Sequence, residues 1–260
     1  MRKLHGRLPV SSFAVVYRAA KLRADMRLGH FRRDYGTGSL RRQELAGDPI
    51  AQFQGWFRQA SGLTREGRWR RVGIALYKLW QALLGRPPLD ANAMALATVS
   101  VEGQPSVRTV LLKGVDARGF VFFTNYDSRK GRELAANPRA ALVFYWPDWE
   151  RQVCITGTVS KLPREESEAY FKTRPRGAQL AAWASNQSDV IPNREALEAR
   201  WQEMARRFEG ADVPLPPNWG GYVLAPEQIE FWQGRLNRLH DRFRYSRQPD
   251  GTWRVDRLCP

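Results

Sequence analysis

At 260 residues, of which 43% are hydrophobic and 12% aromatic, the chain has enough apolar material for a core, which excludes an intrinsically disordered protein. Its formal net charge of +16 predicts an anionic partner, which could be nucleic acid, a phosphorylated small molecule or an acidic membrane surface. Two cysteines and three well-separated histidines argue against a disulfide framework and against any metal site, and favour a reduced, cytoplasmic protein.

Residues 1–30 predict a flexible basic arm ahead of the folded part. The stretch has no acidic residue before Asp25, and Pro9 and Arg18 interrupt its apolar part. This pattern disfavours a signal peptide and leaves a transit peptide as the alternative. No apolar run in the chain reaches the roughly 18 residues that a membrane-spanning helix needs.

Two helices are predicted next. In "GDPIAQFQGWFRQA", Asp48 is a good N-cap and Pro49 suits the first helical position. Residues 64–86 predict a basic amphipathic helix, which either packs on the rest of the protein or a second copy, or docks on an anionic membrane surface. Its apolar stripe consists of Trp69, Val72, Leu76, Leu79, Trp80 and Leu83.

The remaining pattern is rich in strands. Alternating or continuous apolar runs predict strands in "AMALATVSV", "SVRTVLLK", "GFVFFTN", "RAALVFYW", "RQVCITGTVSKL", "YVLAPEQIEFWQG", "RLHDRFRYSR" and "TWRVDRL". Helices are predicted in "SRKGRELAAN", "PREESEAYFKTRP" and "NREALEARWQEMARRFEG". Many strands with few helices between them predict an α+β protein with a mainly antiparallel sheet or barrel and helices packed outside.

No glycine-rich phosphate loop is present, so a phosphate would have to be bound by side chains and a helix end. Arg129 and Lys130 follow the capping Ser128 and become favourable there if an anion docks on the helix N-terminus. Tyr170 and Arg174 are four residues apart on a predicted helix and therefore neighbours. Strict alternation along "SVRTVLLK" places Arg108 and Lys113 on opposite faces, so they should not grip one group together without a bulge.

The stretch "QGRLNRLHDRF" is a further candidate for binding an anion. If it is extended, Arg238, His240 and Arg242 share one face. Such a row of cations fits either a bound anion or a solvated edge strand. The chain offers no paired carboxylates and no Ser-His-Asp or Cys-His arrangement, a pattern that fits an enzyme whose cofactor supplies the chemistry.

Seven motifs taken together resemble the pyridoxamine 5'-phosphate oxidase family, in order, from about Phe31 to Pro260. They are "RRDYGTGSLRR", "RTVLLKG", "FFTNYDSRKGREL", "ERQVCITG", "YFKTRPRGAQLAAWASNQS", "VPLPPNWGGY" and "IEFWQG" followed by "NRLHDRF". The resemblance implies a single split β-barrel domain over residues 31–260, interrupted by the insertion 64–86, and a homodimer with FMN at its interface. It also implies oxidation of pyridoxamine or pyridoxine 5'-phosphate to pyridoxal 5'-phosphate, with oxygen reoxidising the flavin and yielding hydrogen peroxide.

The resemblance also implies the site residues. Substrate contacts fall on Arg32, Tyr35, Lys113, Tyr170, Arg174, Ala178, Arg238 and His240, with Arg238 and His240 acting in catalysis and Arg32 to Tyr35 closing over the substrate. FMN contacts fall on Arg108, Thr109, Val110, Leu111, Leu112, Lys113, Phe123, Thr124, Arg129, Lys130, Gln152, Gln187, Ser188, Trp232 and Arg242.

Two departures from the family pattern keep alternatives open. Ala178 stands where the family usually has a serine that contacts the substrate phosphate, and the insertion enlarges what is usually a short link. A split-barrel flavoprotein with another substrate is therefore the nearest alternative. A basic nucleic-acid-binding protein is disfavoured, because two bound phosphates would account for the best-placed cations, although not for those of the N-terminal arm.

Overall fold

The computed structural model describes residues 35, 36, 38–62 and 90–260. The predicted arm 1–30, Arg32 and the predicted helix 64–86 lie outside the described residues, so these three expectations stay predictions. Tyr35–Pro260 form one compact unit. Within the part of the chain that the structure describes, no helix is long and apolar enough to cross a membrane.

Helix α1 (Pro49–Ala60) begins as its sequence predicts. The Asp48 side chain accepts hydrogen bonds from the amides of Ile50 and Ala51, and proline occupies the first turn. One face of the helix is buried, with the Phe53 ring centroid 4.9 Å from that of Phe120 on the sheet. This packing fixes α1 over the inner face of the sheet.

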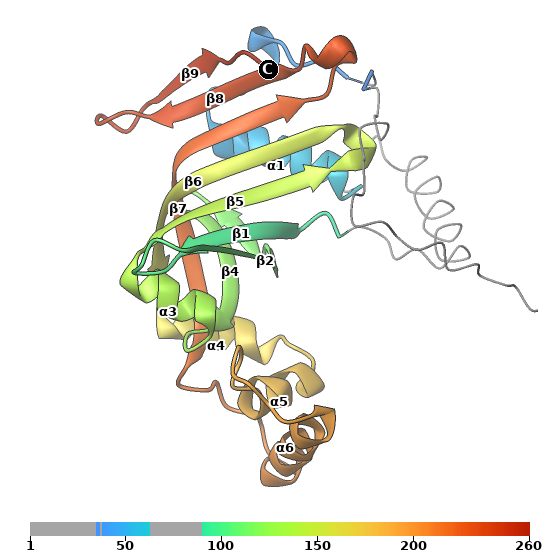
Figure 1. Cartoon of the computed structure of the whole chain (residues 1–260), viewed down its shortest axis with the longest axis vertical. Helices are drawn as coiled ribbons and strands as arrows, with labels where there is room; N and C mark the ends of the chain where they lie inside the picture. Colours follow the sequence, from blue (N-terminus) through green and yellow to red (C-terminus); the bar gives the residue numbers. More distant parts are fainter. Residues whose placement is uncertain (1–34, 37, 63–89) are drawn as a thin grey trace, which may run out of the picture. The chain divides into compact units, whose positions relative to one another are not determined.

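A nine-stranded antiparallel sheet forms the body of the protein (Figure 1), as the strand-rich sequence predicts. The strand order is β2-β1-β5-β6-β7-β4-β3, and β8 and β9 extend the sheet from β7. The strands are β1 (Ala93–Val99), β2 (Pro105–Leu111), β3 (Gly114–Asp116), β4 (Gly119–Asn125), β5 (Arg139–Trp146), β6 (Arg151–Lys161), β7 (Trp219–Gln233), β8 (Asp241–Arg247) and β9 (Trp253–Arg257).

Strand β7 organises the sheet because its two halves have different partners. Its first residues, 219–224, pair with β4, whereas residues 228–233 pair with β8. Strand β6 runs along both halves, with a register shift between Thr156 and Gly157. Figure 1 shows α3 and α4 at one end of the sheet and β8 and β9 at the other.

Four helices lie outside the sheet: α3 (Arg129–Ala136), α4 (Arg164–Lys172), α5 (Arg176–Ala184) and α6 (Arg194–Arg207). Ser128 and Asn193 cap α3 and α6 through their side chains. Helix α5 was not predicted as a separate element. It packs with α6, and Leu180 and Phe208 join Phe171 and Trp219 in a second hydrophobic cluster beside the main core.

The loop before β8 departs from the sequence prediction. A strand from residue 238 is wrong, because β8 begins at Asp241. Residues 236–238 form a short 3-10 helix in which Asn237 and Arg238 have left-handed φ angles of 55° and 61°. Such angles are strained for residues other than glycine and often mark functional positions. Arg238 and His240 therefore belong to a loop, and only Arg242 lies in the strand.

Candidate active site

A cavity of about 490 Å³ lies between the C-terminal part of β2, strand β4 and helices α3 and α4. It brings together eleven of the predicted site residues from five separate segments, which the sequence alone could not place side by side. They are Arg108, Thr109, Val110, Leu111, Lys113, Phe123, Thr124, Lys130, Tyr170, Arg174 and Gln187. Thr173, Pro175 and Trp219 complete the lining and were not predicted.

Arg108 and Lys113 line the same cavity, although strict alternation predicted that they lie on opposite faces. Strand β2 ends at Leu111, and the strict alternation on which the prediction depended ends with it. The Lys113 amide instead bonds to the carbonyl of Val121 on β4.

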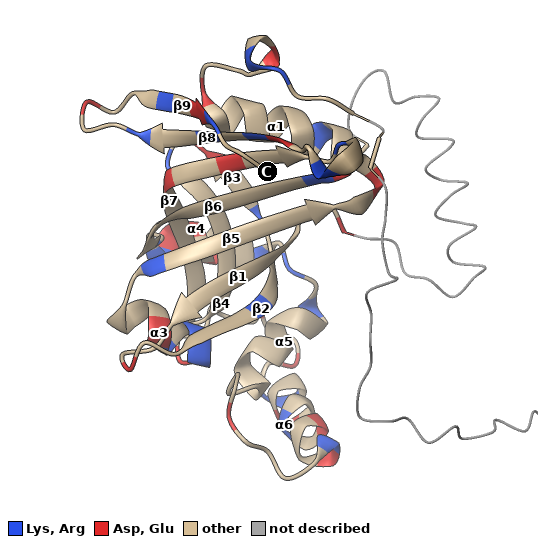
Figure 2. Ribbon diagram, turned by 45° about the horizontal axis from the view of Figure 1, so that its top comes forward, with Lys and Arg blue, Asp and Glu red and all other residues tan. Residues whose placement is uncertain are grey.

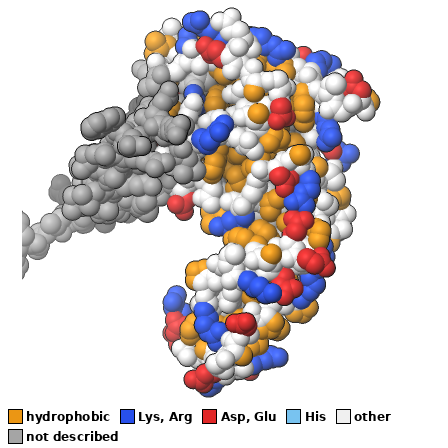
Figure 3. Space-filling view, turned by 180° about the vertical axis from the view of Figure 1, so that it is seen from behind, with side chains coloured by type: hydrophobic (Ala, Val, Ile, Leu, Met, Phe, Trp, Pro, Cys, Tyr) orange, Lys and Arg blue, Asp and Glu red, His pale blue; other side chains and the backbone are white. Residues whose placement is uncertain are grey.

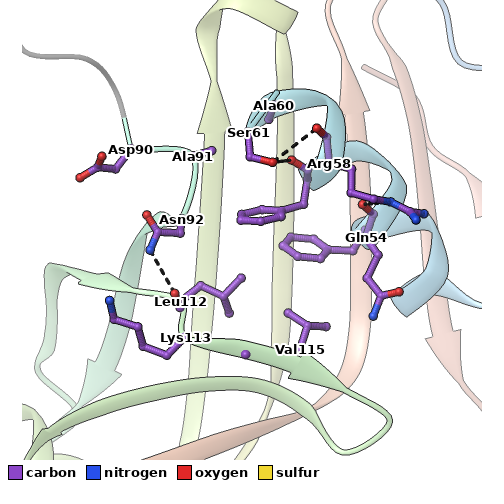
Figure 4. Close-up of a pocket in the computed structure, with 13 residues that line it drawn as sticks. Gln54, Arg58, Ala60, Ser61, Asp90, Ala91, Asn92, Leu112, Lys113 and Val115 are labelled. Atoms are coloured by element: carbon purple, nitrogen blue, oxygen red, sulfur yellow. Dashed lines mark hydrogen bonds between the residues drawn. The ribbon is translucent and has the colours of Figure 1, made fainter. Parts of the chain in front are cut away.

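A second cavity of about 590 Å³ lies between α1 and the residues around β3. Lys113 lines both cavities, whereas Leu112 lines only the second. Figure 4 shows Asn92 beside this bend in the chain, where its Nδ2 donates to the Leu112 carbonyl at 3.1 Å. Leu112 is buried here rather than in the first cavity. Asn92 thus fixes the bend that carries Lys113.

Lys130 is a buried cation with neutral hydrogen-bond partners. Its Nζ donates to Gln187 Oε1 at 2.5 Å, Thr124 Oγ1 at 3.2 Å and Ser128 Oγ at 3.3 Å. Burial, together with the positive charge of Arg108, lowers the pKa of Lys130 to about 8. A buried ammonium group in this state gains from an incoming anion.

Hydroxyl groups cap the start of α3, where the sequence predicts an anion site that stays a prediction. Ser128 Oγ accepts the Gly131 amide at 3.3 Å, and Ser188 Oγ accepts the Arg129 amide at 3.1 Å. Two amides of the first turn are therefore already bonded to hydroxyl groups. Ser188 has a left-handed φ of 81°, which places strain at a predicted contact residue.

Three aromatic rings stack along one wall of the cavity. The centroids of Phe123 and Tyr170 are 3.9 Å apart, those of Phe123 and Trp219 are 5.5 Å apart, and the rings are nearly parallel. Arg174 lies 4.6 Å from the Trp219 centroid. Its Nη1 is buried without a hydrogen-bond partner among the described residues, and burial lowers its pKa. The wall thus presents a cation that lacks an acceptor.

The other predicted residues gather at the far end of β7. Gln152, Trp232 and Arg242 are register partners across β6, β7 and β8. The Tyr35 ring contacts both Trp232 and His240 edge-on, at centroid distances of 5.5 and 5.6 Å. Arg242 is held by Glu230 at 2.8 Å.

His240 is set up as a neutral imidazole. Its Nδ1 accepts the Arg235 amide at 3.1 Å, which leaves the ring proton on Nε2 in the neutral form. Partial burial and the nearby charges of Arg238 and Arg242 lower the pKa of His240. The Nε2 atom can therefore donate a hydrogen bond near neutral pH.

The two groups of residues lie at opposite ends of β7. Thr124 pairs with Gly220 at the start of this strand, whereas Arg242 pairs with Trp232 near its end. The twelve steps along the chain from residue 220 to residue 232 span about 40 Å if the chain is fully extended. The predicted site residues thus form two separate groups in one copy of the chain. They are here called the cavity half-site (Arg108, Lys113, Lys130, Tyr170 and Arg174) and the loop half-site (Tyr35, Trp232, Arg238, His240 and Arg242).

Ala178 lies in the first turn of α5, half-buried, and does not line the cavity. Arg176 is poorly placed to replace the missing serine, because its guanidinium is already bonded. It donates to the Ala211 carbonyl at 2.8 Å and to the carbonyl of Phe208 at the end of α6. Thr173 lines the cavity, but its hydroxyl donates to the Tyr170 carbonyl at 2.7 Å.

Comparison with known proteins decides the family. Residues 84–208 match the family model described as pyridoxamine 5'-phosphate oxidase, and residues 219–260 match the C-terminal dimerisation region of pyridoxine 5'-phosphate oxidase. A pyridoxine/pyridoxamine 5'-phosphate oxidase from Rubrobacter xylanophilus is 52% identical over 90% of this chain and 96% of its own length. The chain belongs to the pyridoxamine 5'-phosphate oxidase family. One from Nostoc punctiforme is 49% identical over 91% of this chain and 100% of its own.

Solved structures of this oxidase family agree with the fold. PhzG from Burkholderia lata, solved with tetrahydrophenazine-1-carboxylic acid, is 35% identical over 72% of this chain and 92% of its own, with a TM-score of 0.63. An FMN-binding protein from Nostoc punctiforme related to pyridoxamine 5'-phosphate oxidase is 21% identical over 73% of this chain and 97% of its own, with a TM-score of 0.54. The predicted split β-barrel and the predicted oxidase family are thereby confirmed.

Proposed function

We propose that the protein binds FMN and oxidises pyridoxamine or pyridoxine 5'-phosphate to pyridoxal 5'-phosphate, with oxygen as the acceptor and hydrogen peroxide as the second product. The observation that carries the proposal is a pair of cations in one cavity, the buried Lys130 and the half-buried Arg174, whose Nη1 atom is buried. Lys130 bonds to neutral oxygens and Arg174 has a nitrogen without an acceptor. Cations that have no anionic partner suit phosphate groups, which both the cofactor and the substrate carry.

The flavin phosphate would be held by Arg108 and Lys130 of the cavity half-site, together with Arg129 and the hydroxyl of Ser188 at the start of α3. Thr124 and Gln187, which bond to Lys130, would complete this set. When bound, the flavin would supply the oxidant that accepts hydrogen and two electrons from the substrate carbon. The chain itself contributes no redox group at this site among the described residues, since its role is to bind and orient.

Substrate would lie against Lys113, Tyr170 and Arg174 at its phosphate end. Arg238 and His240 of the loop half-site would contact the pyridine end, with His240 donating through Nε2. Tyr35, packed edge-on against Trp232 and His240, would cover the ring and exclude water, and Arg32 belongs to the same proposed cover. These contacts would fix the distance and orientation of the two reactants, which lowers the barrier without a reactive group on the protein.

We further propose that each active site is built from two copies of the chain. The half-sites lie at opposite ends of β7, whereas one small ligand must contact both. Four residues of the loop half-site, Trp232, Arg238, His240 and Arg242, lie within residues 219–260, and the match of this segment to a dimerisation region supports the proposal. A two-fold dimer would then pair the cavity half-site of one protomer with the loop half-site of its partner, twice.

Two alternative functions make different predictions. A flavoprotein acting on another substrate draws support from Ala178 and from the similarity to PhzG. A nucleic-acid-binding protein draws support from the net charge, but that charge is concentrated outside the described residues. Residues 1–34 hold nine Lys or Arg and two Asp, and residues 63–89 hold six Lys or Arg and one Glu, which leaves a net charge of only +4 on the rest. Figure 3 accordingly shows cations mixed with acidic side chains over one face.

Purified protein tests the proposal. We expect a yellow protein that binds FMN and forms pyridoxal 5'-phosphate and hydrogen peroxide from pyridoxamine or pyridoxine 5'-phosphate under air. Flavin binding without turnover of either compound would favour the other-substrate alternative. A colourless protein that takes up no FMN but binds DNA with a steep dependence on salt would favour nucleic-acid binding. The two free cysteines, Cys154 and Cys259, agree with the reducing cytoplasm that we include in the proposal.

A further inference from the structure

Glu133 is a buried carboxylate on α3 that bonds to two arginines at once. Its Oε1 accepts the Arg129 Nε at 2.8 Å, and its Oε2 accepts the Arg108 Nη2 at 3.2 Å. The hydroxyls of Ser106, at 2.6 Å, and Thr98 also donate to Oε2. Figure 2 shows the acidic and basic residues side by side on α3.

The carboxylate is charged under all ordinary conditions. Burial alone would raise the pKa of Glu133, but the hydrogen bonds from Ser106, Thr98 and Arg129 and the charge of Arg108 outweigh it and bring the pKa to about 2. A negative charge therefore lies between two guanidinium groups that would otherwise repel each other.

Both arginines are proposed ligands of the flavin phosphate, and they come from different elements, β2 and α3. A long arginine side chain loses rotamer freedom when it binds a ligand, and it loses less if it is already held in place. Arg108 is held on several sides, because Nη1 also bonds to the Leu96 carbonyl at 3.3 Å and to Thr98, and Nη2 to Ser106. Arg129, which is half-exposed, depends more on Glu133.

We propose that Glu133 is a positioning residue for the flavin phosphate, holding Arg108 and Arg129 at a fixed spacing before the cofactor arrives. This inference rests on the proposed function, because it assumes that the two arginines bind the phosphate of FMN. The competing account gives Glu133 a structural role only, as a clamp between α3 and strands β1 and β2 through Thr98 and Ser106. The two accounts differ in what happens to riboflavin, which lacks the phosphate.

Glu133→Gln separates them, since it removes the charge while keeping an acceptor oxygen. Dissociation constants for FMN and for riboflavin would be measured by flavin fluorescence on the apoprotein. We expect the FMN constant to rise by about tenfold, or about 1.4 kcal/mol, with the riboflavin constant within about twofold of wild type. A purely structural role would weaken both flavins together or neither.

Matched variants complete the test. Glu166→Gln removes another carboxylate that pairs with an arginine, Arg118, at 2.8 Å on the surface, and should leave both constants unchanged. Glu133→Asp keeps the charge on a shorter side chain, so it should lose part of the FMN preference and provides the measurement if Glu133→Gln does not fold.

The outcomes are distinct. An unchanged ratio of the two constants in both Glu133 variants, or tighter FMN binding, would overturn the role of Glu133 while leaving the proposed function intact. A wild-type protein that does not prefer FMN over riboflavin would overturn the phosphate site itself, and with it this inference.

Discussion

The Nζ atom of Lys130 lies 2.5 Å from Oε1 of Gln187, so a buried ammonium group is bonded to an amide where a phosphate could be bound. Burial lowers the pKa of Lys130 to about 8 in the free protein, and an adjacent phosphate would raise it. Lys130 is therefore mostly charged below pH 8, and we expect FMN binding to be strongest there. Above pH 8 binding must take up a proton, so FMN affinity should fall by up to about tenfold per pH unit.

FMN titrations between pH 7 and 9.5 check this. Lys130→Arg is the matched control, because arginine stays charged throughout this range and its profile should be nearly flat. Identical profiles in the two proteins would show that Lys130 does not titrate on binding.

Arg238 and Arg242 should separate substrate binding from cofactor binding. Arg238 is an exposed loop residue, whereas Arg242 is fixed in β8 by Glu230. We expect Arg238→Ala to lower kcat/KM for pyridoxamine 5'-phosphate by roughly 10- to 100-fold, since a hydrogen bond to a charged group contributes ~1.5–3 kcal/mol. Flavin content should stay normal, and Arg254→Ala on β9 should change neither quantity. Loss of flavin with normal turnover after reconstitution would reverse the assignment.

Ala178→Ser should restore a phosphate contact that the family usually has. A new hydroxyl in the first turn of α5 would follow Pro175, which lines the cavity, and Arg176 is already bonded elsewhere. We expect KM for pyridoxamine 5'-phosphate to fall three- to thirtyfold, about 0.7–2 kcal/mol, with kcat little changed. Ala181→Ser, on the exposed side of the same helix, is the control. An unchanged or higher KM would mean that the site is built around alanine and would favour another substrate.

Gly131 should be irreplaceable in α3. A Cβ atom there would lie 2.0 Å from the Tyr126 carbonyl oxygen, which is backbone and cannot move aside cheaply. We expect Gly131→Ala to lower the free energy of unfolding by about 1–3 kcal/mol or more. Gly55→Ala in α1 meets nothing within 4 Å and should be neutral or stabilising. Urea unfolding of both variants compares them, and equal stability would contradict the close approach.

Local sequence signals predicted most elements because their physical causes are local. The bounds of β4 and β5 match the apolar runs, and the Asp48 cap places the start of α1. Helix α5 was not predicted, because Pro175 indicates the end of the preceding helix, whereas in the structure it also precedes a new one. The left-handed φ of Arg238 could not be predicted, because in a sequence only glycine indicates such an angle.

The site depended on contacts that sequence cannot show. Motifs placed Lys130 on the right element, whereas the prediction that Arg174 lies on a helix with Tyr170 is wrong, because α4 ends at Lys172. The cavity that Lys130 and Arg174 share depends on the sheet order. Trp219 was not predicted, because it is the first residue of β7 and lies before the apolar run that predicts this strand. Glu133 was not predicted, because a single glutamate in a helix carries no pattern. That Lys113 lines the same cavity as Arg108 could not be predicted, because the sequence does not show that β2 ends at Leu111.

Mixed dimers test the central claim that an active oxidase is assembled from two half-sites of different chains. Arg174→Ala disables the cavity half-site and Arg238→Ala the loop half-site, so each homodimer should be nearly inactive. Co-expression with two different affinity tags isolates the heterodimer, in which one site combines both lesions and the other has none. Pyridoxal 5'-phosphate formation by this heterodimer is the measurement. The account predicts about half of the wild-type rate per dimer, whereas a heterodimer as inactive as its parents would contradict it.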